Sequence, residues 1–75
     1  MERYKNLGGN SGVAAYEIGE GSILVQFRDG SVYEYTDQSA GSSAIATMQR
    51  LAIEGQGLNC YISTTVRKSY FRKLA

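Results

Sequence analysis

The feature that most constrains this fold is an Asp-Gly pair at residues 29–30, which separates two short runs of β-forming residues. The first run, residues 22–28, has apolar side chains at every second position, and the second, residues 31–36, is rich in tyrosine. An Asp-Gly pair between two such runs is typical of a β-hairpin. The sequence therefore predicts two antiparallel strands that turn at Gly30.

The loop length of this hairpin decides which side chains share a face of the sheet. A two-residue loop would pair Val25 with Glu34 and would place that carboxylate on the apolar face. A three-residue loop with a left-handed Gly30, a G1 bulge, pairs Val25 with Tyr33 instead. We therefore predict the bulged turn, because it alone gives a coherent apolar face. That face consists of Ile23, Val25, Phe27, Tyr33 and Tyr35.

Three further segments surround the hairpin. Residues 13–18 are predicted to form a strand ahead of it. Residues 39–54 carry apolar side chains at three- and four-residue spacing, which predicts an amphipathic helix that packs on the sheet. The candidate N-caps of this helix are Asp37, Ser39, Ser42 and Ser43. The tail from Leu58 fits either a strand or a helix, and we favour a short helix near the chain end.

The chain has 75 residues, of which 43% are hydrophobic and 20% charged, so it suits one small domain and not a disordered tail. Residues 1–12 contain a Gly-Gly pair and are expected to form a flexible arm, from which Tyr4 could still dock on the body, whereas residues 13–75 form the folded domain. The predicted fold class is α+β. A small antiparallel meander of three or four strands packs against one main helix, and a short C-terminal helix or an extended basic tail follows.

Composition also excludes several kinds of chemistry. The chain has no histidine, which is the commonest general base near neutral pH and the commonest metal ligand. Its one cysteine, Cys60, allows neither an intrachain disulfide nor a cysteine-based zinc site, and we interpret it as a small buried hydrophobe. We therefore expect no enzymatic activity, no metal and no cofactor. Without disulfides, a signal peptide or a membrane-spanning run, the protein is expected in the cytoplasm and away from membranes.

Three stretches of the chain, taken in order, resemble a known family. The first is residues 27–35, with an aromatic, a turn glycine and a Tyr-x-Tyr motif, and the second is the amphipathic helix. The third is Gly55-Gln56-Gly57-Leu58-Asn59-Cys60-Tyr61-Ile62, closed by Tyr70-Phe71-Arg72-Lys73-Leu74. Together they resemble the KTSC domain, a small module at the C-terminus of some lysyl-tRNA synthetases that is also a stand-alone bacterial protein. The resemblance covers roughly residues 11–74 and implies RNA binding, which has been suggested for a family without an established activity.

Charge is unevenly distributed along the chain. Residues 55–75 carry four cations and no acid, whereas residues 1–54 carry four cations against seven acids. Such an asymmetry points to an anionic partner, but we favour the simpler explanation of a solvated terminus with cations near a helix end. If RNA is the partner, tail cations would neutralise phosphates and nearby rings would stack on bases. The candidate nucleic-acid-binding residues are Arg67, Lys68, Arg72, Lys73, Tyr61, Tyr70 and Phe71.

The first functional hypothesis is therefore a small non-catalytic module that binds RNA through its basic tail. The alternative is a protein-interaction or assembly module that uses an exposed strand edge or the tail. Tyr33 and Tyr35 would offer a stacking platform if they were exposed, but on the apolar face beneath the helix they are better interpreted as core. The residues assigned structural roles are Phe27, Gly30, Tyr33 and Tyr35.

Overall fold

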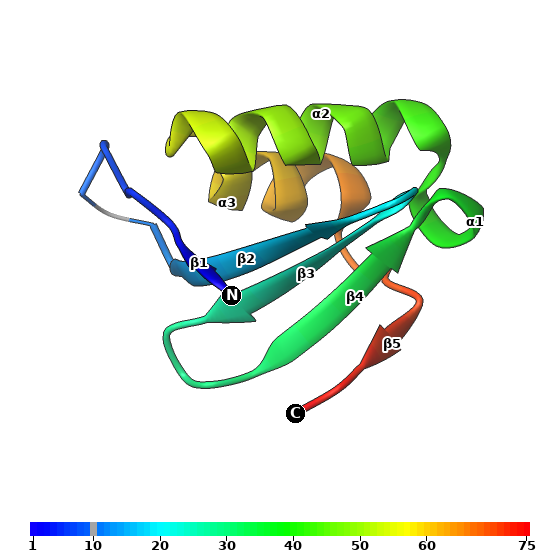
Figure 1. Ribbon diagram of the computed structural model, residues 1–75, viewed down its shortest axis with the longest axis horizontal. Helices are drawn as coiled ribbons and strands as arrows, with labels where there is room; N and C mark the ends of the chain where they lie inside the picture. The colour runs from blue at the N-terminus through cyan, green and yellow to red at the C-terminus, as the bar shows by residue number, and fades with distance from the viewer. Residues whose placement is uncertain (10) are drawn as a thin grey trace.

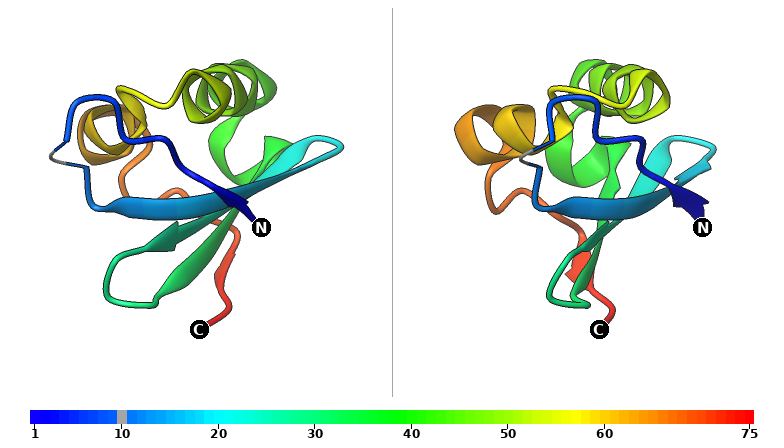
Figure 2. Two further views of the ribbon diagram at one scale, coloured as in Figure 1. Left: turned by 60° about the vertical axis from the view of Figure 1, so that its left-hand side comes forward. Right: turned by 90° about the vertical axis from the view of Figure 1, so that its left-hand side faces the viewer.

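The computed structural model describes residues 1–9 and 11–75. An antiparallel sheet of five strands, in the order β1-β2-β3-β4-β5, carries α2 and α3 on one face (Figures 1 and 2). The strands are β1 (Glu2–Arg3), β2 (Val13–Gly19), β3 (Ser22–Phe27), β4 (Val32–Thr36) and β5 (Arg72–Lys73). The helices are α1 (Asp37–Ala40), α2 (Ser42–Glu54), α3 (Leu58–Tyr61) and the π-helical turn η1 (Ile62–Val66). The predicted α+β class is confirmed, and the short edge strands β1 and β5 extend the predicted meander.

The β3–β4 hairpin has the predicted register. Val25 pairs with Tyr33, and the Phe27 N–H donates to the Ser31 carbonyl at 2.8 Å. Gly30 has a φ of +91°, and its N–H donates back to the Phe27 carbonyl at 2.9 Å. The bulged turn is therefore confirmed, and it requires glycine because a Cβ at this φ would strain the backbone.

The core lies between the inner face of the sheet and the helices above it. Its fully buried members include Ile23, Val25, Tyr35, Met48 and Leu58. Burying an aliphatic side chain of this size stabilises the fold by about 1.5–3 kcal/mol, so these side chains dominate stability. The core assignment of Tyr35 is confirmed, with 2% of its surface exposed. Phe27 and Tyr33 are only half-buried, because they pack at the edge of this core and face an open groove.

The predicted helix over residues 39–54 is two helices, separated at Gly41, whose φ is +95°. The first of them begins earlier than predicted, because its N-cap is Thr36. None of the four candidate N-caps has this role in the first helix. The Thr36 Oγ1 accepts from the Ser39 N–H at 3.2 Å, and the Ser39 Oγ accepts from the Thr36 N–H at 3.0 Å. This reciprocal capping box lets the chain pass from β4 into α1 without a loop.

The N-terminal segment lies against the body of the protein, whereas we expected a flexible arm over residues 1–12. Strand β1 pairs with β2, with Glu2 opposite Tyr16. Tyr4 is 3% exposed, and the Leu7 N–H donates to the Gly55 carbonyl at 2.7 Å. One buried aromatic and backbone hydrogen bonds therefore hold a glycine-rich segment that has little apolar content of its own. Asn10, which the sequence also assigns to the arm, lies outside the described residues.

Both interpretations of the tail hold in part. Residues 58–66 are helical, because Leu58, Ile62 and Val66 recur every four residues and all three are buried. The helix ends at Arg67, whose φ is +46°, in a turn that the Ser69 N–H closes by donating to the Val66 carbonyl at 2.8 Å. The chain then passes through irregular backbone to β5, which pairs with β4. The short helix therefore lies earlier in the tail than we predicted.

The assignment of Cys60 as buried is wrong, because its side chain is exposed. Leu58 and Ile62 occupy the inward positions of this helix, so the residue midway between them points outward. Across residues 1–9 and 11–75, no helix combines the length and the apolarity that crossing a bilayer requires.

Candidate functional site

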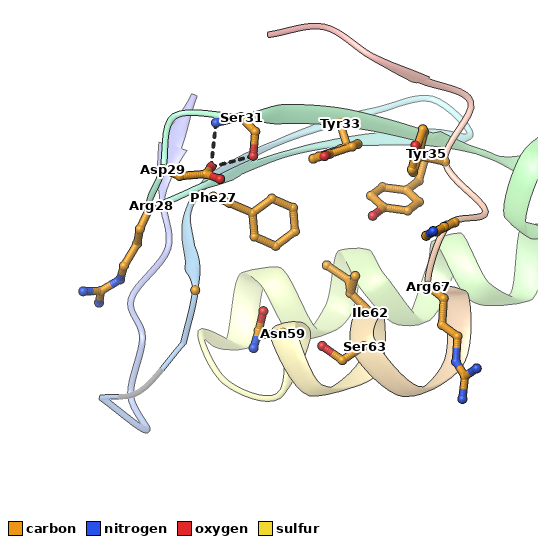
Figure 3. Close-up of a pocket in the computed structure, with 13 residues that line it drawn as sticks. Phe27, Arg28, Asp29, Ser31, Tyr33, Tyr35, Asn59, Ile62, Ser63 and Arg67 are labelled. Atoms are coloured by element: carbon orange, nitrogen blue, oxygen red, sulfur yellow. Dashed lines mark hydrogen bonds between the residues drawn. The ribbon is translucent and has the colours of Figure 1, made fainter.

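A groove of about 520 Å³ runs between the inner face of the β3–β4 hairpin and the α3–η1 helical segment (Figure 3). The hairpin wall carries the rings of Phe27, Tyr33 and Tyr35. The helical wall carries Asn59, Ile62 and Ser63. Aromatic walls with a few polar groups, within the roughly 300–1,000 Å³ of most ligand sites, make this groove the candidate functional site.

The rings of the hairpin wall form a contiguous cluster. Phe27 and Tyr33 meet edge to face, with their centroids 5.7 Å apart and their planes at 77°. Tyr70, from the chain between η1 and β5, lies with its centroid 4.7 Å from that of Tyr33 and 6.2 Å from that of Tyr35. Each ring is held by its neighbours, so the aromatic wall is already formed without a ligand.

Tyr35 forms the buried floor of this cluster. Burial, with smaller contributions from the nearby Tyr33 and Tyr70 hydroxyls, raises the pKa of Tyr35 to about 12. The phenol therefore stays protonated near neutral pH. It supplies a neutral hydroxyl to the groove and neither a base nor a negative charge.

Cations stand at both ends of the groove. Arg28 lies at the end next to the hairpin turn, and Arg67 lies at the opposite end, where the helical segment finishes (Figure 3). Lys68 lines the groove beside Arg67, and the Lys73 Nζ lies 5.7 Å from the centroid of the Tyr33 ring. Within the described part of the chain, none of these four side chains takes part in a salt bridge.

Asp29 is the one carboxylate among the described residues that line the groove. Its Oδ1 accepts hydrogen bonds from the Ser31 Oγ at 2.6 Å and the Ser31 N–H at 2.9 Å. These two hydrogen bonds lower the pKa of the Asp29 carboxyl, and the charge of Lys73 adds a smaller effect in the same direction. The carboxylate is therefore engaged with the hairpin turn, and the net charge around the groove stays positive.

The structure brings some of the predicted binding residues together and separates others. Arg67, Lys68 and Tyr70 line the groove, and Lys73 lies beside it. Arg72 pairs through its Nε with the Glu34 Oε1 at 2.6 Å, on the face of the sheet opposite to Lys73. The two remaining rings do not line the groove: Phe71 is 56% exposed, and Tyr61 packs against the core.

Sequence reasoning missed several residues of the groove. Asn59 and Ser63 are four positions apart and share one helical face, which becomes visible only once residues 58–66 are known to be helical. Strand alternation alone would place Arg28 on the outer, solvated face of the sheet. This residue lies next to the bulge, where alternation no longer determines which way a side chain points.

Comparison of the chain with protein-family models, with curated proteins and with solved structures found no match. The resemblance to the KTSC domain therefore stays a prediction. The distinguishing property of the groove is a preformed aromatic wall with a cation at each end, neither of which forms a salt bridge among residues 1–9 and 11–75.

Proposed function

We propose that this protein is a small non-catalytic module that binds single-stranded RNA in the groove. Bases stack on the aromatic wall, and phosphates lie at the cationic ends. The observation that carries this proposal is the arrangement of Phe27 and Tyr33 between Arg28 at one end and Arg67 at the other (Figure 3). Aromatic platforms flanked by positive charge are the usual means of binding single strands.

The rings supply the sequence-tolerant part of the interaction. Phe27 and Tyr33 are half-buried, so each is held by the core while part of its surface faces the groove. Stacking of a base on a protein ring is worth about 1–3 kcal/mol. Paired bases in a duplex are already stacked and cannot enter between the hairpin and the helix. The groove is therefore expected to prefer single strands.

The charges supply the electrostatic part of the interaction. The groove is surrounded by Arg28, Arg67, Lys68 and Lys73, and Asp29 is the one acid among the lining residues that the structure describes. If all four cations neutralise a phosphate, log K falls against log salt with a slope of about −2.8, since each contact on a single strand contributes roughly 0.7. This proposal keeps three of the four tail cations that the sequence indicates. It leaves out Arg72, which is engaged with Glu34.

A protein-interaction role through a strand edge has less support. The two edge strands, β1 and β5, have two residues each and consist of charged side chains. Short, charged edges are how natural sheets avoid pairing with other chains. The proposed RNA partner also agrees with the expected cytoplasmic location and with the resemblance to the KTSC domain, which are themselves predictions.

Fluorescence anisotropy with a labelled single-stranded oligoribonucleotide tests the proposal. We expect binding at low salt that weakens roughly 50-fold between about 50 and 200 mM salt, as the slope requires. Lys68→Gln should weaken binding and reduce the slope. Arg50→Gln is the matched control, because Arg50 lies on α2 and pairs with Glu54 at 3.2 Å. Failure of every single strand to bind, or equal binding of a duplex, would refute the proposal.

A further inference from the structure

A second hollow, also of about 520 Å³, lies between the N-terminal segment and the start of β2. It is lined by Arg3, Tyr4, Lys5, Asn6, Val13, Ala14 and Arg28. Three of these seven residues are cations, and none of the described lining residues is an acid. No functional role was predicted for these residues, because residues 1–12 were expected to form a flexible arm.

The three cations of this hollow lack acidic partners in the described structure. The salt bridges there engage Glu17 with the N-terminal amine, Glu54 with Arg50 and Glu34 with Arg72. None of them reaches Arg3, Lys5 or Arg28. Like charges that share one hollow repel one another, and a bound anion would relieve that repulsion.

The backbone holds two of these cations, Arg3 and Arg28, in place. Arg3 lies in β1 opposite Ala15, and the next residue, Tyr4, donates its N–H to the Ala14 carbonyl at 3.0 Å. The Arg28 N–H donates to the Gly12 carbonyl at 2.8 Å. The anchor points of the side chains are therefore fixed before any ligand binds, which lowers the entropy that binding must overcome.

The hollow and the groove meet at Arg28, which lines both of them. Its side chain is directed away from the ring of Phe27, while its backbone remains at the end of the aromatic wall (Figure 3). An extended ligand that leaves the groove past the hairpin turn would pass Arg28 and enter the hollow. The two surfaces therefore form one path across the molecule.

We propose that the hollow of Arg3, Lys5 and Arg28 holds the sugar–phosphate backbone of the same RNA strand whose bases stack in the groove. This inference rests on the proposed function and deepens it. It names the ligand as a strand that spans both surfaces, in contrast to a mononucleotide. An arginine guanidinium donates paired hydrogen bonds to phosphate oxygens. Because no base contact is needed in the hollow, binding there is expected to be independent of the RNA sequence.

The test compares oligouridylates of about two and about eight nucleotides. The longer of the two lies within the usual site size of single-strand binders. The double variant Arg3→Gln, Lys5→Gln removes two cations from the hollow and leaves the groove intact. For the longer strand, we expect weaker binding and a salt slope smaller by about 1.4, because two phosphate contacts are lost. The shorter strand should bind the variant and the wild type equally. The double variant Arg50→Gln, Arg72→Gln is the control for loss of charge alone.

The outcomes separate this inference from the proposed function. If neither oligouridylate binds the wild type, both fail together. If both strands bind and the hollow variant leaves the affinity and slope of the longer one unchanged, the hollow plays no part and only this inference fails. If inorganic phosphate displaces the longer strand as effectively as unlabelled strand does, the hollow is an isolated anion site, and the continuous path is also refuted.

Discussion

The hydroxyl oxygen of Tyr4 accepts a hydrogen bond from the backbone N–H of Leu58 at 3.3 Å, across a separation of 54 positions in the sequence. The N-cap of α3, Gly57, offers no side-chain hydrogen bond, so the tyrosine satisfies an N–H that the helix start would leave unpaired. Both residues are buried, at 3% and 0% exposure. The N-terminal segment thereby positions the helical wall of the groove.

This contact predicts that Tyr4→Phe destabilises the protein although it keeps the ring. The Leu58 N–H would remain buried without a partner, so we expect the free energy of unfolding to fall by about 1–2 kcal/mol. Urea denaturation measures this change. Tyr16→Phe is the control, because Tyr16 is half-buried and its hydroxyl makes no hydrogen bond to another described residue. Equal stability of Tyr4→Phe and the wild type would show that the contact contributes nothing.

The geometry of the hairpin turn predicts that the stability of the protein depends strongly on glycine at position 30. Gly30→Val should lower the free energy of unfolding by more than about 1 kcal/mol, because a β-branched residue is strained at a φ of +91°. A Cβ at this position would have no atom within 4 Å, so strain alone causes the loss. Gly8→Val is the matched control, since Gly8 has equal space and no positive φ. Similar melting temperatures for the two variants would contradict the bulged turn.

The backbone conformation of Arg67 predicts that one substitution at this position raises stability and weakens RNA binding. Its φ of +46° is strained for any residue with a Cβ, at a cost of about 1–3 kcal/mol. Arg67→Gly should relieve this strain and raise the free energy of unfolding by about 1 kcal/mol, after the entropic cost of glycine. The same change removes a cation from the end of the groove and should weaken RNA binding.

Lys68→Gly is the control for this prediction, because Lys68 has no positive φ. It should lose binding and lose stability together, since glycine then brings only its entropic cost. Calorimetry and anisotropy on the two variants measure both quantities. A lower melting temperature for Arg67→Gly would show that its backbone is not strained.

The raised pKa of Tyr35, about 12, predicts how stability depends on alkaline pH. An unfolded tyrosine titrates near its ordinary pKa of about 10, so the folded state holds this proton more tightly. The stabilisation is complete below about pH 10 and is lost as the pH rises from there toward about 12. Tyr35→Phe should flatten the pH dependence of the urea midpoint over that range. An unchanged alkaline dependence in this variant would contradict the assigned pKa.

Local sequence patterns were sufficient to predict the central β3–β4 hairpin. The register of β3 on β4 was predictable because strand alternation and the bulge at Gly30 involve neighbouring residues only. The position of Tyr35 in the core followed from that register. The N-cap at Thr36 was missed because this residue is both the last residue of β4 and the N-cap of α1. Sequence patterns assign each residue to a single element, so Thr36 was counted only as part of the strand.

Contacts between distant segments account for most of what the sequence did not predict. The N-terminal segment has too few apolar residues to indicate a fixed position, and its order depends on Tyr4 reaching Leu58. In the candidate site, Arg67, Lys68 and Tyr70 were predicted from charge and ring content near the chain end. Phe27 and Tyr33 were predicted as core, because no local pattern shows that the helices leave one end of the sheet uncovered.

The most direct test of the central claim is the affinity of Phe27→Leu for a single-stranded oligoribonucleotide. Leucine keeps an apolar side chain at the edge of the core, so the variant should stay folded, within about 1.5 kcal/mol of the wild type. Loss of one stacking ring should weaken binding about 10-fold, within the 1–3 kcal/mol of such contacts. The salt slope should stay at its wild-type value, because stacking releases few counterions. A folded Phe27→Leu protein that binds RNA as tightly as the wild type would contradict the account.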